Sequence, residues 1–234
     1  MKGMAQTGPL RPPGPPTSLV ELDARCVAIA GRTVGEVAHL YGYRVPRTLQ
    51  TNKGFIGQIA EIALGASAGS DPEPDFPSLG IELKTLPVRE GGRTLEATYI
   101  CTARLTGTES LDFAESYVMK KLARVLFLPV MDDGETPLTE RRFGMSFLWS
   151  PDPEELGVLR EDFVRLQARV RMGESDDITT KDGVALHLRP KAMNRHDLTT
   201  GVSDEGWVVA LRPKAWYLRR EFTARIVARH FGLS

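Results

Sequence analysis

The feature that most constrains the fold is an alternating apolar run within residues 74–85. Apolar side chains occupy every second position of this run, and the side chains of a β-strand point to opposite faces with a period of two. The apolar positions are Leu79, Ile81 and Leu83. We therefore predict a strand over residues 79–85 whose other face carries Glu82 and Lys84, roughly 6.6–6.8 Å apart along the strand.

An acidic side chain precedes this run and follows a proline. Asp75 has to fold back from the turn to reach the face that carries Glu82 and Lys84. Two carboxylates can hold a hard cation such as Mg²⁺, and the main-chain carbonyl of Leu83 can add a third oxygen ligand. A neighbouring ammonium offsets the clustered negative charge. The combination suits metal-assisted phosphodiester hydrolysis, but the same residues also fit a strand with an ion pair on its wet face.

The composition is that of a globular protein with a packed core. The chain has 234 residues, is 41% apolar, and balances 30 Lys and Arg against 30 Asp and Glu, which argues against a uniformly cationic DNA-coating protein. Its two cysteines give no disulfide framework, and it lacks an apolar run of transmembrane length and a signal-peptide core. We expect a cytoplasmic protein with a flexible Pro-rich tail over residues 1–17 and a single domain over residues 18–234.

The chain order predicts helices first and then a mixed sheet, which is an α/β (α+β mixed sheet) arrangement. Helical spacing and capping signals predict helices over residues 18–42 (two helices), 53–65, 112–122, 152–172 and 221–231. Apolar runs predict strands over residues 94–103, 124–130, 143–149, 184–188 and 207–211. A Gly-Gly turn at residues 90–93 suggests that the strand of residues 79–85 and that of residues 94–103 form a hairpin.

Glu61 is the only acid of the third predicted helix. It fits a solvated helix position, because Glu is a good helix former, and it also fits a carboxylate that faces the metal site from a neighbouring element. The small-residue loop at residues 65–70 lacks the Gly-Lys-Ser/Thr ending of a Walker A motif, so a nucleoside triphosphate site is not expected.

Two basic segments repeat the sequence Arg-Pro-Lys-Ala directly after an apolar run, at residues 189–192 and 212–215. Proline stiffens the backbone and removes a donor, so two rigid loops would present Arg and Lys to a nucleic-acid groove. The alternative is a pair of unrelated surface turns, with Trp216 or Tyr217 packed in the core.

Several blocks, in order and at matching spacing, resemble the MutH family of strand-nicking endonucleases, which is related to type II restriction enzymes that cut GATC. The likeness covers residues 18–231. The blocks are Lys53–Gly57, Glu61–Ile62, Leu64–Ser70, Asp75–Phe76, Leu79–Thr85, Thr106–Gly107, Lys121–Leu122, Arg124–Leu126, Leu148–Pro151, Arg189–Ala192 and Ala228–Phe231.

The resemblance implies a restriction-endonuclease-like PD-(D/E)xK fold with two lobes around a DNA-binding cleft. It implies a monomer that acts on double-stranded DNA and nicks the unmethylated strand of hemimethylated GATC, 5′ to the G. It also implies Mg²⁺ as cofactor, with Mn²⁺ as a substitute, and activation by MutL after MutS finds a mismatch.

At matching positions the resemblance implies roles for individual residues. The implied catalytic set is Asp75, Glu82 and Lys84, with Glu61 in the metal cluster beside the carbonyl of Leu83. The implied DNA contacts are Lys53 and Lys121, the base-reading segment Arg189, Pro190 and Lys191, and Tyr217, which senses adenine methylation. The chain departs from the family at Tyr99, where Phe is expected, and at the second basic triplet, Arg212-Pro213-Lys214.

Two other functions remain open at the level of sequence. One is a GATC-specific type II restriction endonuclease that acts without a repair partner. The other is a catalytically silent DNA-binding protein of the same fold, against which the intact Asp75, Glu82 and Lys84 set argues.

Overall fold

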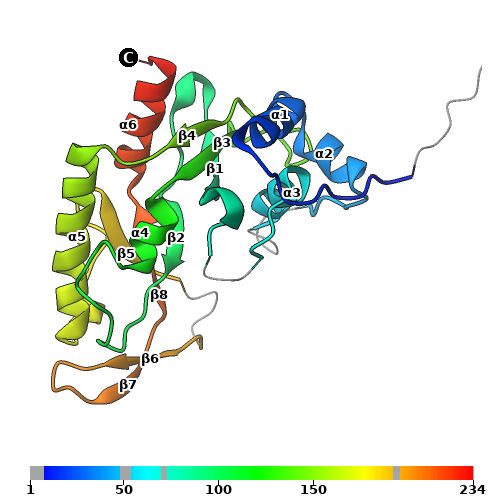
Figure 1. Cartoon of the computed structure of the whole chain (residues 1–234). Helices are drawn as coiled ribbons and strands as arrows, with labels where there is room; N and C mark the ends of the chain where they lie inside the picture. The colour runs from blue at the N-terminus through cyan, green and yellow to red at the C-terminus, as the bar shows by residue number, and fades with distance from the viewer. Residues whose placement is uncertain (1–7, 48–53, 70–72, 192–195, 234) are drawn as a thin grey trace, which may run out of the picture. The chain divides into compact units, whose positions relative to one another are not determined.

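The computed structural model describes residues 8–47, 54–69, 73–191 and 196–233 of a mixed α/β chain (Figure 1). The chain divides into two compact units. The first unit consists of Met1–Gly91 and Leu126–Leu148, and the second consists of Gly92–Val125 and Trp149–Ser234. The predicted mixture of helices and strands is therefore present, but the strands form small separate sheets where one mixed sheet was expected. The cleft between two lobes stays a prediction.

Three helices build one side of the first unit, where they lie together in Figure 1. They are α1 (Leu19–Ile29), α2 (Val34–Leu40) and α3 (Phe55–Leu64), and α3 contacts both of the others. The predicted start signals are confirmed, since the Ser18 and Thr33 side chains accept backbone N–H groups from the first turns of α1 and α2. α3 ends at Gly65, whose φ of 80° is left-handed.

A three-stranded sheet completes the first unit in the order β1-β3-β4. The strands are β1 (Glu82–Val88), β3 (Val125–Met131) and β4 (Phe147–Trp149). The prediction of a strand over residues 79–85 is wrong at its start, because Pro77–Leu79 form a 3₁₀ turn (η1) and Gly80 has a φ of 63°. The predicted burial is correct for Ile81 and Leu83, which are 0% and 6% exposed.

The segment from residue 8 to residue 17 forms no helix or strand and contacts the helices of the first unit. The N–H of Leu10 donates to the carbonyl of Leu40 at 2.7 Å, and the guanidinium of Arg25 donates to the carbonyls of Gly14 and Leu64, both at 2.7 Å. Prolines suit this arrangement because they favour extended backbone and leave carbonyls as acceptors. The tail predicted over residues 1–17 falls partly outside the described residues.

An antiparallel sheet with the order β2-β8-β5 forms the centre of the second unit. Its strands are β2 (Thr98–Thr102), β8 (Lys214–Leu218) and β5 (Leu186–Pro190). Around it are the helices α4 (Tyr117–Leu122), α5 (Pro153–Arg171) and α6 (Arg220–Phe231), the short 3₁₀ turn η3 (Ser175–Asp177), and a ribbon of β6 (Thr199–Val202) and β7 (Val208–Leu211). α5 packs on the sheet through Phe163, whose ring lies 5.2 Å from that of Trp216.

A buried carboxylate on α5 holds the start of β5. Oδ2 of Asp162, which is 2% exposed, accepts the backbone N–H groups of Val184, Ala185 and Leu186 at 2.7, 2.6 and 2.9 Å. Arg165 donates to Oδ1 of the same carboxylate at 2.8 Å. The strand that carries Arg189 therefore begins at a position that α5 fixes.

Some predictions about these elements are wrong, and one strand was not predicted. Residues 79–85 and 94–103 do not form a hairpin, because β1 pairs within β1-β3-β4 while β2 pairs with β8. Hairpin loops usually have about two to five residues, and here the whole segment 89–97, including the 3₁₀ turn η2 (Glu90–Gly92), lies between the two strands. The predicted helix of residues 112–122 begins only at Tyr117, and the strand β6 had no predicted counterpart.

Within the described residues, no helix is long and apolar enough to cross a membrane.

Candidate active site

A local bridge returns Asp75 to the start of β1. Phe76 and Ile81 form an antiparallel bridge, in which the N–H of Phe76 donates to the carbonyl of Ile81 at 2.9 Å and the reverse bond measures 3.3 Å. The 3₁₀ turn of Pro77–Leu79 closes the loop, and Gly80 supplies the left-handed residue that follows it. In this antiparallel register the next pair outward is Asp75 and Glu82.

The two carboxylates lie at the same end of β1. Oδ2 of Asp75 accepts the N–H of Leu83 at 2.8 Å, and the carbonyl of Asp75 accepts the N–H of Ser67 at 3.0 Å. The side chain of Asp75 is therefore held against the backbone beside Glu82. The return of Asp75 to β1, which the sequence analysis required, is therefore present.

Glu82 and Lys84 lie on one face of β1, as their spacing predicted. Nζ of Lys84 is 2.7 Å from Oε1 of Glu82. Glu82 is only 3% exposed, and the neighbouring strand β3 is largely apolar. A buried carboxylate requires a charge partner or hydrogen bonds, and Lys84 supplies an ammonium at close range.

Glu61 lies on α3 and is half-buried. α3 packs against β1, so the helix belongs to the same unit as Asp75 and Glu82. Across residues 8–47, 54–69, 73–191 and 196–233, no three Asp, Glu, His or Cys side chains form a group that could hold a metal ion. The participation of Glu61 in the metal cluster stays a prediction, and Lys53 lies outside the described residues.

The remaining predicted site residues belong to the second unit. Lys121 is on α4. Arg189 and Pro190 were expected in a loop, but they form the end of β5, and Tyr217, also expected in a loop, is in β8. Pro190 is tolerated there because β5 is an edge strand of its sheet.

Cations and aromatic rings alternate on this sheet. The guanidinium of Arg189 lies 5.2 Å from the ring centre of Tyr217, and Nζ of Lys191 lies 4.9 Å from that of Tyr99. The two rings meet edge to face at 5.5 Å. Burial raises the pKa of Tyr217, while the charge of Arg189 opposes that shift. The phenol therefore stays neutral at ordinary pH and can offer an apolar ring and a hydroxyl group to a ligand.

Lys191 has two hydroxyl partners that the sequence did not reveal. Its Nζ donates to the hydroxyls of Tyr99 at 3.0 Å and of Thr102 at 2.7 Å. In a regular strand residues 99 and 102 would point to opposite faces. A register irregularity between Tyr99 and Cys101 brings them to one face, and strand periodicity alone gives no sign of it.

The second Arg-Pro-Lys triplet does not form a projecting basic loop, so the expectation for Lys214 is wrong. Lys214 is 4% exposed in β8. Its ammonium donates to the carbonyl of Ser175 and to that of Ile178, the latter at 3.2 Å. Burial lowers the pKa of Lys214. Of the two basic residues in this triplet, Arg212 is exposed to solvent and Lys214 is buried.

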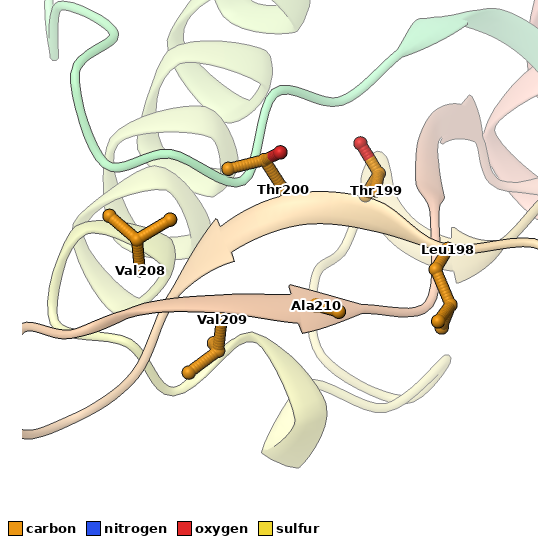
Figure 2. A pocket seen from close by; sticks show the side chains of 6 residues that line it. All are labelled: Leu198, Thr199, Thr200, Val208, Val209 and Ala210. Atoms are coloured by element: carbon orange, nitrogen blue, oxygen red, sulfur yellow. The ribbon is translucent and has the colours of Figure 1, made fainter.

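A pocket of about 430 Å³ lies along the β6–β7 ribbon. Figure 2 shows that both strands contribute side chains to it. Its lining residues are Leu198, Thr199, Thr200, Val208, Val209 and Ala210. They carry no titratable group, so this pocket has no means of acid–base or metal chemistry.

Comparisons with known proteins show what the chain as a whole is similar to. The family model described as "DNA mismatch repair enzyme MutH" matches residues 64–162. Proteins named "DNA mismatch repair protein MutH" are similar over nearly the whole chain. One from Yersinia enterocolitica is 43% identical over 95% of this chain and 97% of its own length, one from Vibrio parahaemolyticus is 45% identical over 92% and 96%, and one from Shigella flexneri is 44% identical over 97% and 99%.

Proposed function

The chain belongs to the MutH family of DNA mismatch repair endonucleases, and from this premise we propose that Asp75, Glu82 and Lys84 carry its phosphodiester hydrolysis. We propose a restriction-endonuclease-like PD-(D/E)xK fold in which the chain nicks the unmethylated strand at hemimethylated GATC, 5′ to the G. The observation that carries the assignment is the return of Asp75 to β1, where its carboxylate accepts the N–H of Leu83 beside Glu82.

The residues at the start of β1 fit a divalent cation such as Mg²⁺, with Mn²⁺ as a substitute. Mg²⁺ takes hard oxygen ligands and commonly one or two carboxylates, and Asp75 and Glu82 offer two, with the carbonyl of Leu83 as a main-chain candidate. Glu61 is a further carboxylate of the same unit and a candidate for the cluster. A bound divalent cation lowers the pKa of a water molecule and polarises a phosphoryl oxygen.

The protein groups have separate tasks in this proposal. The backbone bond to Leu83 fixes the orientation of Asp75, and the contact with Lys84 fixes that of Glu82. Lys84 places an ammonium beside Glu82, which offsets negative charge at the start of β1. From that position its ammonium either orients the attacking water or balances charge on the phosphate.

The second unit supplies DNA recognition in the proposal. Arg189, Pro190 and Lys191 read bases, and Tyr217 senses adenine methylation. An ammonium that donates to the O6 and N7 acceptors of guanine is a common major-groove contact. Lys53 and Lys121 contribute to DNA binding. Activation by MutL, with MutS acting upstream, completes the proposed repair role of a monomer.

The test is cleavage of GATC duplexes that are unmethylated, hemimethylated or fully methylated, each with and without MutL. We expect nicks in the unmethylated strand only, 5′ to the G, stimulated by MutL and dependent on Mg²⁺. Rapid double-strand cutting of unmethylated GATC without MutL would show a restriction endonuclease instead. Binding without cleavage under every condition would show a silent DNA-binding protein.

A matched pair of variants tests the residue assignment. Asp75→Asn keeps the shape of the side chain but removes its charge, so we expect cleavage to be lost while DNA affinity stays within about threefold. Glu140→Gln, which changes an exposed acid elsewhere in the first unit, serves as the control and should cleave normally. Cleavage by Asp75→Asn at the rate of the unmodified protein would refute the assignment.

A further inference from the structure

The β-bulge in β2 brings together side chains that would point to opposite faces of a regular strand. Tyr99 pairs with Tyr217 across the sheet, but the neighbouring residue of β8, Trp216, lies opposite Cys101. The extra residue reverses the alternation of side chains after Tyr99. As a result the hydroxyls of Tyr99 and Thr102 lie 3.2 Å apart.

Both hydroxyls meet the ammonium of Lys191. Its Nζ donates to the hydroxyl of Tyr99 at 3.0 Å and to that of Thr102 at 2.7 Å. The backbone of Lys191 is fixed as well, because its N–H donates to the carbonyl of Pro213 at 2.8 Å. An ammonium has three donors, so these two contacts direct it and leave one donor for a ligand.

Tyr99 also contacts the second recognition residue. Its ring meets the ring of Tyr217 edge to face, with centroids 5.5 Å apart. Arg189 lies on the Tyr217 ring, 5.2 Å from its centre. Tyr99 therefore touches Lys191 through its hydroxyl and Tyr217 through its ring, so one side chain supports two different contacts.

We infer that Tyr99 and Thr102 are positioning residues for DNA specificity. Their hydroxyls aim Lys191 at a base-edge acceptor, while the ring of Tyr99 sets the position of Tyr217. This inference rests on the proposed function, in which Lys191 reads a base pair and Tyr217 senses adenine methylation. It adds two residues of β2 to the proposed recognition site. The hydroxyl of Tyr99 supports base reading, and its ring supports methyl sensing.

The experiment separates the hydroxyl from the ring by substitution. Tyr99→Phe and Thr102→Val each remove a hydroxyl and keep most of the shape, whereas Tyr99→Leu removes the ring as well. The first measured quantity is the kcat/KM ratio between GATC and a duplex with the G·C pair changed. The second is the ratio between the unmethylated and methylated strands of hemimethylated GATC.

Distinct patterns are expected for the variants. The double variant Tyr99→Phe with Thr102→Val should lower base-pair discrimination by about five- to tenfold, because it removes two hydrogen bonds to a charged group, and strand discrimination should stay within about twofold. Tyr99→Leu should lower strand discrimination as well, by about two- to tenfold, because the edge-to-face contact is lost.

Controls exclude a general loss of structure. Tyr43→Phe and Thr108→Val remove hydroxyls from exposed residues outside this cluster, and both ratios should stay unchanged in these variants. The thermal midpoint and the affinity for DNA without GATC should stay unchanged in the Tyr99→Phe and Thr102→Val variants as well. A purely structural role would move those two quantities and leave the ratios alone.

The remaining outcomes overturn the inference, and they differ in what else they overturn. If Lys191→Ala lowers base-pair discrimination but the double variant does not, the hydroxyls have no positioning role and the proposed function stands. If Lys191→Ala also leaves discrimination unchanged, the base-reading part of the proposed function fails together with the inference. Faster cleavage by the double variant at an unchanged ratio would mean that the hydroxyls restrain Lys191.

Discussion

Replacement of Asp162 should be among the most destabilising single substitutions in the second unit. Its Oδ2 accepts three backbone N–H groups at 2.6–2.9 Å, and the carboxylate is 2% exposed. Asp162→Ala leaves these donors without a partner, and a buried unsatisfied donor costs about 1–3 kcal/mol. Val184 lies at the edge of the site and is more exposed than Ala185 and Leu186, so we expect a total of roughly 3–6 kcal/mol.

A graded set of variants tests this magnitude. Asp162→Asn keeps an oxygen at the site of Oδ2 but loses the charge, so it should cost about 1–2 kcal/mol. Arg165→Ala should cost less than about 1 kcal/mol because the Arg165 side chain is 53% exposed and its ion pair is screened. Glu161→Ala, at an exposed position of the same helix, is the matched control and should cost nearly nothing.

The assay is urea unfolding followed by circular dichroism, together with the thermal midpoint. For a chain of this size, about 1 kcal/mol corresponds to roughly 2–4 °C, so Asp162→Ala should lower the midpoint by on the order of 10 °C. A loss below about 1 kcal/mol for Asp162→Ala would refute the claim that these three hydrogen bonds fix the start of β5.

Three further predictions concern other residues. Gly80→Ala should lower stability by about 1 kcal/mol and slow cleavage, because φ at this position is 63° in the turn that returns Asp75 to β1. Thermal unfolding and nicking rates measure the two effects, and an unchanged nicking rate would show that the turn does not influence catalysis. Lys214→Ala should cost about 1–3 kcal/mol by leaving two carbonyl groups unpaired, and Arg212→Ala almost nothing, both by urea unfolding; equal effects would contradict the burial of Lys214. Burial lowers the pKa of His187, so as the pH falls below about 6.5 the unfolded state binds the proton first and the stability of the folded protein decreases. His187→Phe should therefore lose less stability than the unmodified protein between pH 7 and 5. Identical profiles of stability against pH would refute this linkage.

Local signals in the sequence predicted local structure well. The capping residues Ser18, Thr33 and Asp152 start helices as expected, because a cap forms between residues three apart. The pair Glu82 and Lys84 lies on one face for a similar reason, since strand periodicity is a property of the backbone. The fold-back of Asp75 was a requirement of the proposed chemistry, and the bridge between Phe76 and Ile81 shows how the chain achieves it.

The errors arose where distant segments decide the structure. Pairing of β2 with β8 joins residues more than a hundred positions apart, and nothing in the short segment after β1 encodes that partner. Pro190 suggested a loop, yet it lies on an edge strand, where the absence of an N–H does no harm. The contact of Tyr99 and Thr102 with Lys191 depends on a bulge that no periodic pattern reveals.

The interleaved course of the chain has a consequence for its synthesis. The first unit takes Met1–Gly91 and then Leu126–Leu148, while the second takes the segments between and after them. On a ribosome β1 would emerge well before its neighbour β3. The sheet that includes Glu82 could therefore form only after most of the first 148 residues had left the exit tunnel. A fragment that ends at residue 91 would contain β1 without its neighbour β3, so it should fail to form the nuclease site.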